Sequence, residues 1–141
     1  MNDRVFFDTN IICYAFDLKE PAKREICEKL VKRVMNGEIA AFVSNQILGE
    51  VFNASVKKLG LSTDKAKIIV QTMIESEKWH KVDYTYNTIN NAVEKFEQSR
   101  IPFWDLVIIE TMKEHGISEI ITENEGHFDR IPGIKVRNPL K

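Results

Sequence analysis

The sequence predicts a three-layer α/β/α sandwich with a mainly parallel central sheet. Short β-branched and aromatic segments alternate along the chain with longer amphipathic segments, which is the order of βαβ units. The first apolar segment, Val5–Phe7, has polar flanks but no internal alternation, as expected for a strand covered on both faces. The 141 residues contain no linker or repeat, so we expect one domain over residues 1–141.

The first half of the chain supplies two strands and two helices. A short helix over residues 10–17 follows the first strand. A second helix is expected from Pro21 to Met35, because proline suits the first helical position and Gly37 suits the residue after the end. The segment IAAFVS, residues 39–44, is the second strand.

The middle of the chain supplies a helical pair and a short strand. Residues 46–59 carry apolar side chains at helical spacing and stop before Gly60. Ser62 or Thr63 caps the next helix, since a hydroxyl there accepts from the first free backbone N–H groups. The segment KVDYT, residues 81–85, is a predicted short strand.

The last third returns to the same alternation. Asn87 or Thr88 caps a helix through Phe96, and a further helix follows Pro102 and ends at Gly116. The two remaining predicted strands are residues 119–122 and 134–136.

The bulk composition restricts the class of protein. The chain is 43% hydrophobic with a mean hydropathy of -0.27, which is typical of a globular domain. No apolar run reaches the roughly 20 residues of a membrane helix, and no signal peptide is evident, so we expect a cytoplasmic protein without a membrane partner. Cys13 and Cys27 lack metal-binding or redox spacing and are expected to be reduced and buried.

The net charge is -1, with 20 basic and 21 acidic residues. Composition alone therefore gives no sign of a nucleic-acid partner. A nucleic-acid partner would have to be bound through a local cationic patch, a bound metal or a shared oligomer surface.

Polar side chains stand where the predicted strands end. Asp8 follows the first strand, Ser44 ends the second, and Glu123 and Asn124 follow the strand over 119–122. Because parallel strands end at one edge of the sheet, and ligands bind there, these side chains are candidates for one site.

Two more acids are ambiguous when taken singly. Glu50 lies among apolar helical positions, but a place at the rim of the core, or pairing with Lys57 or Lys58 on a solvated face, would explain it. Asp105 opens a helix, where the helix dipole favours an acid without any function. Asp8 itself suits a helix cap. Their combination at these three places is more informative than any one of them.

Four motifs in order carry a family resemblance. They are FFDTN at residues 6–10, SNQILGE at 44–50, FWDLVI at 103–108 and IITENEGHFDRIPGIKVRNP at 120–139. Together they resemble the motifs of the PIN-domain nucleases, and the chain is most similar to the VapC-type toxin subunit of VapBC toxin–antitoxin pairs. The resemblance covers nearly the whole chain.

The resemblance implies a metal-dependent endoribonuclease, the toxin of a type II toxin–antitoxin pair, that leaves 5′-phosphate and 3′-hydroxyl ends. The implied catalytic residues and metal ligands are Asp8, Glu50, Asp105 and Asn124, holding one or two Mg²⁺ or Mn²⁺ ions. Carboxylates suit hard cations, and the cation would offset the charge of the phosphodiester. The implied partners are RNA, a cognate antitoxin and a second copy of the chain.

The fourth ligand position departs from the fullest family pattern. Many members carry Asp two residues after the motif threonine, where this chain has Asn124. An amide oxygen can bind a metal but brings no charge. Glu123 and Asp129 are alternatives for this position.

Several neighbours are candidates for supporting roles. Thr9 and Asn10 would orient Asp8 or touch phosphate, and Ser44 would hydrogen-bond a ligand carboxylate. Arg100 and Arg130 flank the motifs and are placed to contact phosphate.

Other basic and aromatic side chains are given ordinary structural roles. His127 lies in the loop of the last motif and is expected to be a surface histidine, with an approach to substrate as the less favoured alternative. The lysines after the Glu50 helix are interpreted as a solvated face, with RNA contact as the less favoured alternative; they are Lys57, Lys58, Lys65 and Lys67. Aromatic residues near the motifs are expected in the core; they are Phe42, Phe52, Phe96, Phe103 and Trp104.

Three alternatives remain. The first is a catalytically weak or inactive PIN-like module that binds RNA or protein, which Asn124 favours. The second is a haloacid-dehalogenase-like phosphatase, which would need an acid at Asn10. The third is a nucleotide-binding Rossmann domain, which would need a glycine-rich turn after the first strand.

Overall fold

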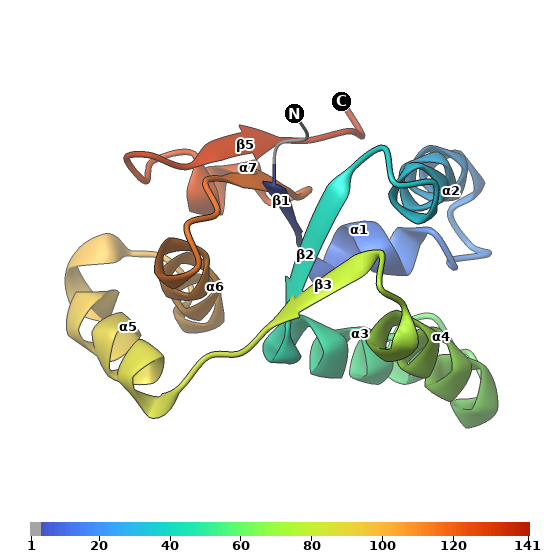
Figure 1. Cartoon of the computed structure of the whole chain (residues 1–141), viewed down its shortest axis with the longest axis horizontal. Helices are drawn as coiled ribbons and strands as arrows, with labels where there is room; N and C mark the ends of the chain where they lie inside the picture. Colours follow the sequence, from blue (N-terminus) through green and yellow to red (C-terminus); the bar gives the residue numbers. More distant parts are fainter. Residues whose placement is uncertain (1–3) are drawn as a thin grey trace.

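A computed structural model describes residues 4–141 and shows a five-stranded sheet flanked by helices (Figure 1). The strand order is β3-β2-β1-β4-β5, and every pairing among the described strands is parallel. The predicted α/β class is therefore confirmed. The strands are β1 (Arg4–Phe7), β2 (Ala40–Ser44), β3 (Trp79–Val82), β4 (Glu119–Ile121) and β5 (Lys135–Arg137).

Helices connect every pair of consecutive strands. The sheet separates α5 and α6 from α1 and α2 (Figure 1), α1 also contacts α3, and α3 contacts α4. The helices are α1 (Thr9–Tyr14), α2 (Pro21–Met35), α3 (Asn45–Lys57), α4 (Thr63–Glu75), α5 (Tyr86–Ser99), α6 (Phe103–Glu114) and α7 (Glu125–Phe128). None of the helices in residues 4–141 has the length and apolar character needed to cross a membrane.

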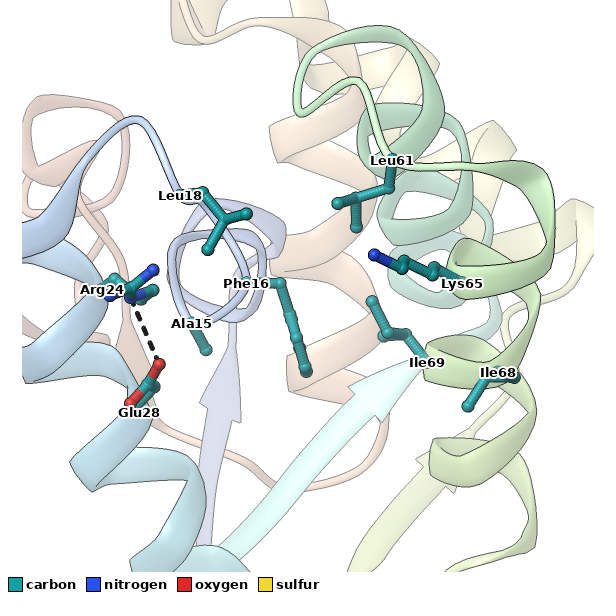
Figure 2. Close-up of a pocket in the computed structure, with 9 residues that line it drawn as sticks. All are labelled: Ala15, Phe16, Leu18, Arg24, Glu28, Leu61, Lys65, Ile68 and Ile69. Atoms are coloured by element: carbon teal, nitrogen blue, oxygen red, sulfur yellow. Dashed lines mark ion pairs between the residues drawn. The ribbon is translucent and has the colours of Figure 1, made fainter.

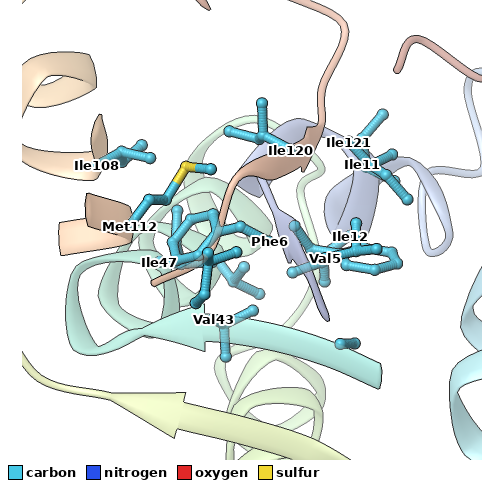
Figure 3. Close-up of a cluster of buried hydrophobic side chains, with 14 of the residues drawn as sticks. Val5, Phe6, Ile11, Ile12, Val43, Ile47, Ile108, Met112, Ile120 and Ile121 are labelled. Atoms are coloured by element: carbon cyan, nitrogen blue, oxygen red, sulfur yellow. The ribbon is translucent and has the colours of Figure 1, made fainter. Parts of the chain in front are cut away.

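The core forms on both faces of β1, whose Phe6 and Phe7 are fully buried. Figure 3 shows Phe6 gathered with side chains from α1, α3, α6 and β4, including Ile47 and Met112. A strand with both faces covered has no polar face, which explains the unbroken apolar run of its sequence. Cys13 and Cys27 are buried free thiols, as predicted.

Most bounds shift by one to three residues from the sequence prediction, and larger differences occur at β3, at the cap of α5 and at α7. The strand expected over residues 81–85 is Trp79–Val82, because Trp79 is buried edge-on against the Phe7 ring at 5.3 Å and pairs with β2. The cap of α5 is Thr85, whose backbone N–H donates to Thr88 Oγ1 at 3.1 Å. The short helix α7 was not predicted.

The strand order creates a crevice next to β1. The chain runs outward from β1 through β2 to β3, then crosses back to place β4 on the other side of β1. Neighbouring strands whose connections leave in opposite directions open a space beyond their carboxyl ends. Asp8 follows β1 and Thr122 follows β4, so both stand at this switch point.

Candidate active site

Asp8 stands at the switch point and is only 4% exposed. Its Oδ1 accepts from the backbone N–H of Thr9 at 2.8 Å, so Asp8 is also the N-cap of α1. Its Oδ2 accepts from the Thr122 hydroxyl at 2.7 Å, and the Asn10 amide lies 3.4 Å away. The Asp8 carboxylate can therefore cap α1 and also belong to a functional site.

Glu50 reaches the same crevice from α3. Its Oε1 accepts from the Thr9 hydroxyl at 2.6 Å, and its Oε2 accepts from the Gln46 amide at 3.1 Å. Gln46 also donates to the backbone carbonyl of Trp104 at 3.2 Å, which ties α3 to the start of α6. Pairing of Glu50 with Lys57 or Lys58, the alternative left open by the sequence, is not what the structure shows.

Asp105 enters from the first turn of α6. Its Oδ2 lies 2.5 Å from Nδ1 of His127, a residue of α7. Among residues 4–141, Oδ1 of Asp105 has no hydrogen-bond partner, so this oxygen is available to a ligand. The contact gives His127 a specific partner that the expected surface role did not include.

The segment after β4 completes the crevice. The backbone N–H of Asn124 donates to Thr122 Oγ1 at 3.0 Å, and that of Glu123 donates to Asn10 Oδ1 at 3.2 Å. The Glu123 carboxylate turns to α1 and α2, where it accepts from Tyr14 at 2.7 Å and pairs with Lys23 at 2.9 Å. Asn124, rather than Glu123, thus lines the crevice.

The acids influence one another electrostatically. The pKa of Asp8 is raised to about 6, mainly because the carboxyl group is buried. The charges of Asp105 and Glu50 also raise this pKa, whereas the hydrogen bond from Thr122 lowers it. Burial also raises the pKa of Asp105, which the hydrogen bond from His127 opposes. Such shifts indicate carboxylates held together without enough positive charge beside them.

These residues line one cleft with a volume of about 520 Å³. It includes six of the predicted site residues, and Asp17, which the sequence did not single out. The six are Asp8, Thr9, Asn10, Glu50, Asp105 and Asn124.

Four other candidates lie outside the cleft lining. Ser44 is buried, and its hydroxyl accepts from the backbone N–H of Ile47 at 3.3 Å, which is an N-cap role. Arg100 is the left-handed C-cap of α5, with φ of 59°. Arg130 and Asp129 are exposed residues after α7.

The donor chemistry of the cleft suits a hard divalent cation, because three carboxylates and one amide oxygen are the ligand types such ions prefer. Their present placement is not that of a finished metal site. Within the described part of the chain, no three His, Cys, Asp or Glu side chains are close enough to surround one ion. Hydrogen bonds from Thr9 and Gln46 engage both oxygens of Glu50, and His127 engages one oxygen of Asp105.

The family model for the PIN domain matches residues 5–134, and thus contains all of these residues. The chain belongs to the PIN domain family. No curated protein matches it in sequence.

Several solved structures are similar to this PIN domain in fold. VapBC from Salmonella typhimurium bound to DNA gives a TM-score of 0.67 at 19% identity, over 99% of both chains. A toxin–antitoxin complex from Klebsiella pneumoniae gives 0.65 at 18% identity, over 96% of this chain and 97% of that one. VapC20 from Mycobacterium tuberculosis, a toxin that cleaves the sarcin–ricin loop, gives 0.65 at 17% identity, over 82% and 86%.

The PIN domain carries a second hollow beside the cleft. This apolar groove has a volume of about 370 Å³ (Figure 2). The turn that follows α1 forms one side of the groove, and α4 forms the other. Leu18 and Ile68 leave 72% and 63% of their surfaces exposed there. The other lining residues are Ala15, Phe16, Arg24, Glu28, Leu61, Lys65 and Ile69.

His127, Gln46 and Thr122 contact the acids in ways that sequence reasoning missed. His127 reaches Asp105 across 22 positions, and Gln46 touches Glu50 one helical turn away. The spacing of Gln46 and Glu50 is four residues on one helix, so their contact could have been anticipated. Nothing local to His127 indicates its partner.

Proposed function

We propose that this PIN domain is a metal-dependent endoribonuclease and the toxin of a type II toxin–antitoxin pair. The observation that carries the proposal is the meeting of Asp8, Glu50, Asp105 and Asn124 in one cleft at the switch point of the sheet. A fold alone would not require three acids there, because each lowers stability unless something positive offsets its charge.

The side chains of the cleft have two roles in the proposed reaction: some would bind the metal, and others orient the metal ligands. Asp8, Glu50 and Asp105 would hold Mg²⁺ or Mn²⁺ with Asn124. When bound, such an ion lowers the pKa of a coordinated water and shields the phosphate charge. Thr122 and Thr9 fix the orientations of Asp8 and Glu50 through their hydroxyl groups. His127 holds Oδ2 of Asp105, which leaves Oδ1 as the oxygen that would bind the ion.

A non-catalytic binding module is the second candidate. It is favoured because, among residues 4–141, no three His, Cys, Asp or Glu side chains are already arranged to hold one metal ion. The nuclease proposal requires the side chain of Glu50 or Asp105 to rotate when the ion binds. The binding module requires no such change.

We expect purified protein to generate new 5′-phosphate ends in total cellular RNA. Mapping of 5′ ends would be done with Mn²⁺, with EDTA, and with Glu50→Gln, which keeps the size of the side chain and an oxygen for Thr9. Ends that need both the metal and Glu50 would support the nuclease. The mapped positions would also identify the RNA class.

Asp129→Asn is the matched control, since Asp129 is exposed and outside the cleft. It should cut like the unaltered protein. Metal binding without any new ends would favour the binding module. Equal loss of cutting in both variants would contradict the assignment of the cleft.

We predict that His127→Ala weakens Mn²⁺ binding and lowers the cleavage rate, each by about 10- to 100-fold, because residues that orient metal ligands have effects of this size. His127→Asn should restore much of the loss, since its amide can donate near the position of Nδ1. Mn²⁺ titration by calorimetry measures the first effect and initial rates the second.

His80→Ala is a suitable control, because His80 stacks on Phe42 at 4.7 Å, a contact between strands β2 and β3. It should leave Mn²⁺ affinity unchanged. Tighter Mn²⁺ binding by His127→Ala would mean that His127 competes with the ion for Asp105 instead of orienting it.

We propose that the antitoxin occupies the apolar groove of Figure 2. The groove exposes large aliphatic side chains that a protein partner would cover. The segment around the end of α1 lines both hollows, with Tyr14 and Asp17 on the cleft and Phe16 on the groove. A partner seated there could extend an Arg or Lys into the cleft and compete with the metal for the carboxylates.

The homodimer implied by the resemblance stays a proposal. The expectation that Phe52, Phe96 and Trp104 lie in the core is wrong, and Phe52 on α3 is 37% exposed. Phe96 on α5 and Trp104 on α6 are each about half exposed. Phe103 connects them through edge-to-face ring contacts of 6.3 and 5.2 Å. This aromatic row is the surface we assign to a second copy of the chain.

A further inference from the structure

The cleft contains two lysines that its acids do not neutralise. Lys57 ends α3 and Lys58 is its C-cap, and both line the cleft with Asp8, Glu50 and Asp105. Neither ammonium group has an ion pair with a carboxylate among residues 4–141. Lysines elsewhere on this protein do pair, as Lys95 does with Glu110 at 2.9 Å.

The position of these lysines follows from the geometry of α3. Glu50, Asn53 and Lys57 lie at i, i+3 and i+7, and therefore share one face of the helix. All three line the cleft. With a rise of about 1.5 Å per residue, Lys57 stands about 10 Å along the helix axis from Glu50. The helix dipole explains a lysine in the last turn, but it does not explain why that lysine lines the same cleft as the acids.

We propose that Lys57 and Lys58 form a subsite for a backbone phosphate of single-stranded RNA, next to the phosphate that is cut. This inference rests on the proposed nuclease function. A chain whose scissile phosphate lies at the acids must continue along the cleft, and α3 offers it Asn53 and then the two lysines. Lysine ammonium groups bind phosphate as point charges, so the subsite positions RNA without reading its sequence.

The structure separates these lysines from the two that follow in sequence. Lys65 lines the apolar groove and Lys67 lies exposed on α4, outside the cleft. Lys65→Ala/Lys67→Ala therefore removes the same charge as Lys57→Ala/Lys58→Ala, but not from the cleft. Lys57 and Lys58 are exposed, so their replacement should not prevent folding.

The test measures binding of a fluorescein-labelled oligouridylate by anisotropy over a series of salt concentrations with Mg²⁺. All proteins carry Asp8→Asn so that the RNA stays intact. Each phosphate contact on a single strand contributes about 0.7 to the slope of log K against log[salt]. Because the two lysines share one phosphate, Lys57→Ala/Lys58→Ala should reduce the slope by about 0.7 and weaken binding at least tenfold, while Lys65→Ala/Lys67→Ala changes neither.

The kinetic counterpart uses unaltered Asp8. Losing a contact made equally in substrate and transition state raises KM and leaves kcat nearly unchanged, which is the result expected for Lys57→Ala/Lys58→Ala. Equal slopes for both double variants, or a larger effect of the α4 pair, would overturn the subsite. If the Asp8→Asn protein binds no RNA and the unaltered protein cuts none, the nuclease proposal itself fails. Cutting with unchanged KM would overturn the subsite alone.

Discussion

Replacement of Asp8 with asparagine is expected to abolish RNA cleavage and, at the same time, to stabilise the metal-free protein at neutral pH. The loss of cleavage should exceed about 100-fold, because this substitution removes a proposed metal ligand, and even residues that only support ligands have effects of 10- to 100-fold. End-labelled RNA and single-turnover rates would measure it.

The gain in stability follows from the pKa of Asp8. Burial raises this pKa from 3.8 to about 6, so the folded protein binds the proton more tightly than the unfolded chain. The stabilising contribution is complete below pH 3.8 and is lost as the pH rises through about 6. Since each pH unit of difference is worth about 1.4 kcal/mol, the ionised carboxylate costs about 3 kcal/mol above that pH.

Asparagine has no charge to bury, and its oxygen can still accept from the backbone N–H of Thr9. Urea unfolding well above pH 6 without metal should therefore show Asp8→Asn to be the more stable protein, by up to about 3 kcal/mol. Near pH 4 the advantage should vanish. Asp129→Asn, which changes an exposed carboxylate, should show no advantage at either pH. Lower stability of Asp8→Asn at both pH values would mean that the hydrogen bond from Thr122 outweighs the burial of charge.

Most of the elements and the position of Asp8 could be predicted because their signals are local, whereas Glu50 and Asp105 became candidates only through the combined motifs. Val5–Phe7 is an unbroken apolar run, and Pro21 and Gly37 bracket α2 as expected. Asp8 directly follows a strand, and parallel strands end at one edge, so its placement required no distances. The predicted bounds of β3 were wrong because Trp79 packs edge-on against the ring of Phe7, a residue 72 positions earlier in the chain.

The hydrogen-bond partners of the acids could not be predicted, because most of them lie far away in the sequence. Glu50 is held by Thr9, and Glu123 is drawn away from the cleft by Lys23, a residue 100 positions before it. Such contacts depend on how α1, α2 and α3 are placed against the sheet, which no local pattern encodes. The fourth ligand position illustrates the difference: the sequence left Glu123, Asn124 and Asp129 open, and tertiary contacts place only Asn124 on the cleft.

Addition of Mn²⁺ or Mg²⁺ is expected to raise the melting temperature of the protein. An ion that binds only the folded state stabilises it by about 2.7 kcal/mol at 100 times its dissociation constant. For a domain of this size each kcal/mol corresponds to about 3–5 °C, so the shift should be about 10 °C. Scanning calorimetry at increasing metal concentration would measure it.

The shift should depend on pH and on the acids of the cleft. Metal binding requires ionised carboxylates, and the raised pKa values of Asp8 and Asp105 mean that protons compete with the ion in mildly acidic solution. The rise should therefore be larger well above pH 6 than near pH 5. It should be lost in Asp105→Asn and kept in Asp129→Asn. A melting temperature that does not respond to either ion above pH 6 would contradict the metal site, and with it the explanation for three carboxylates at the switch point.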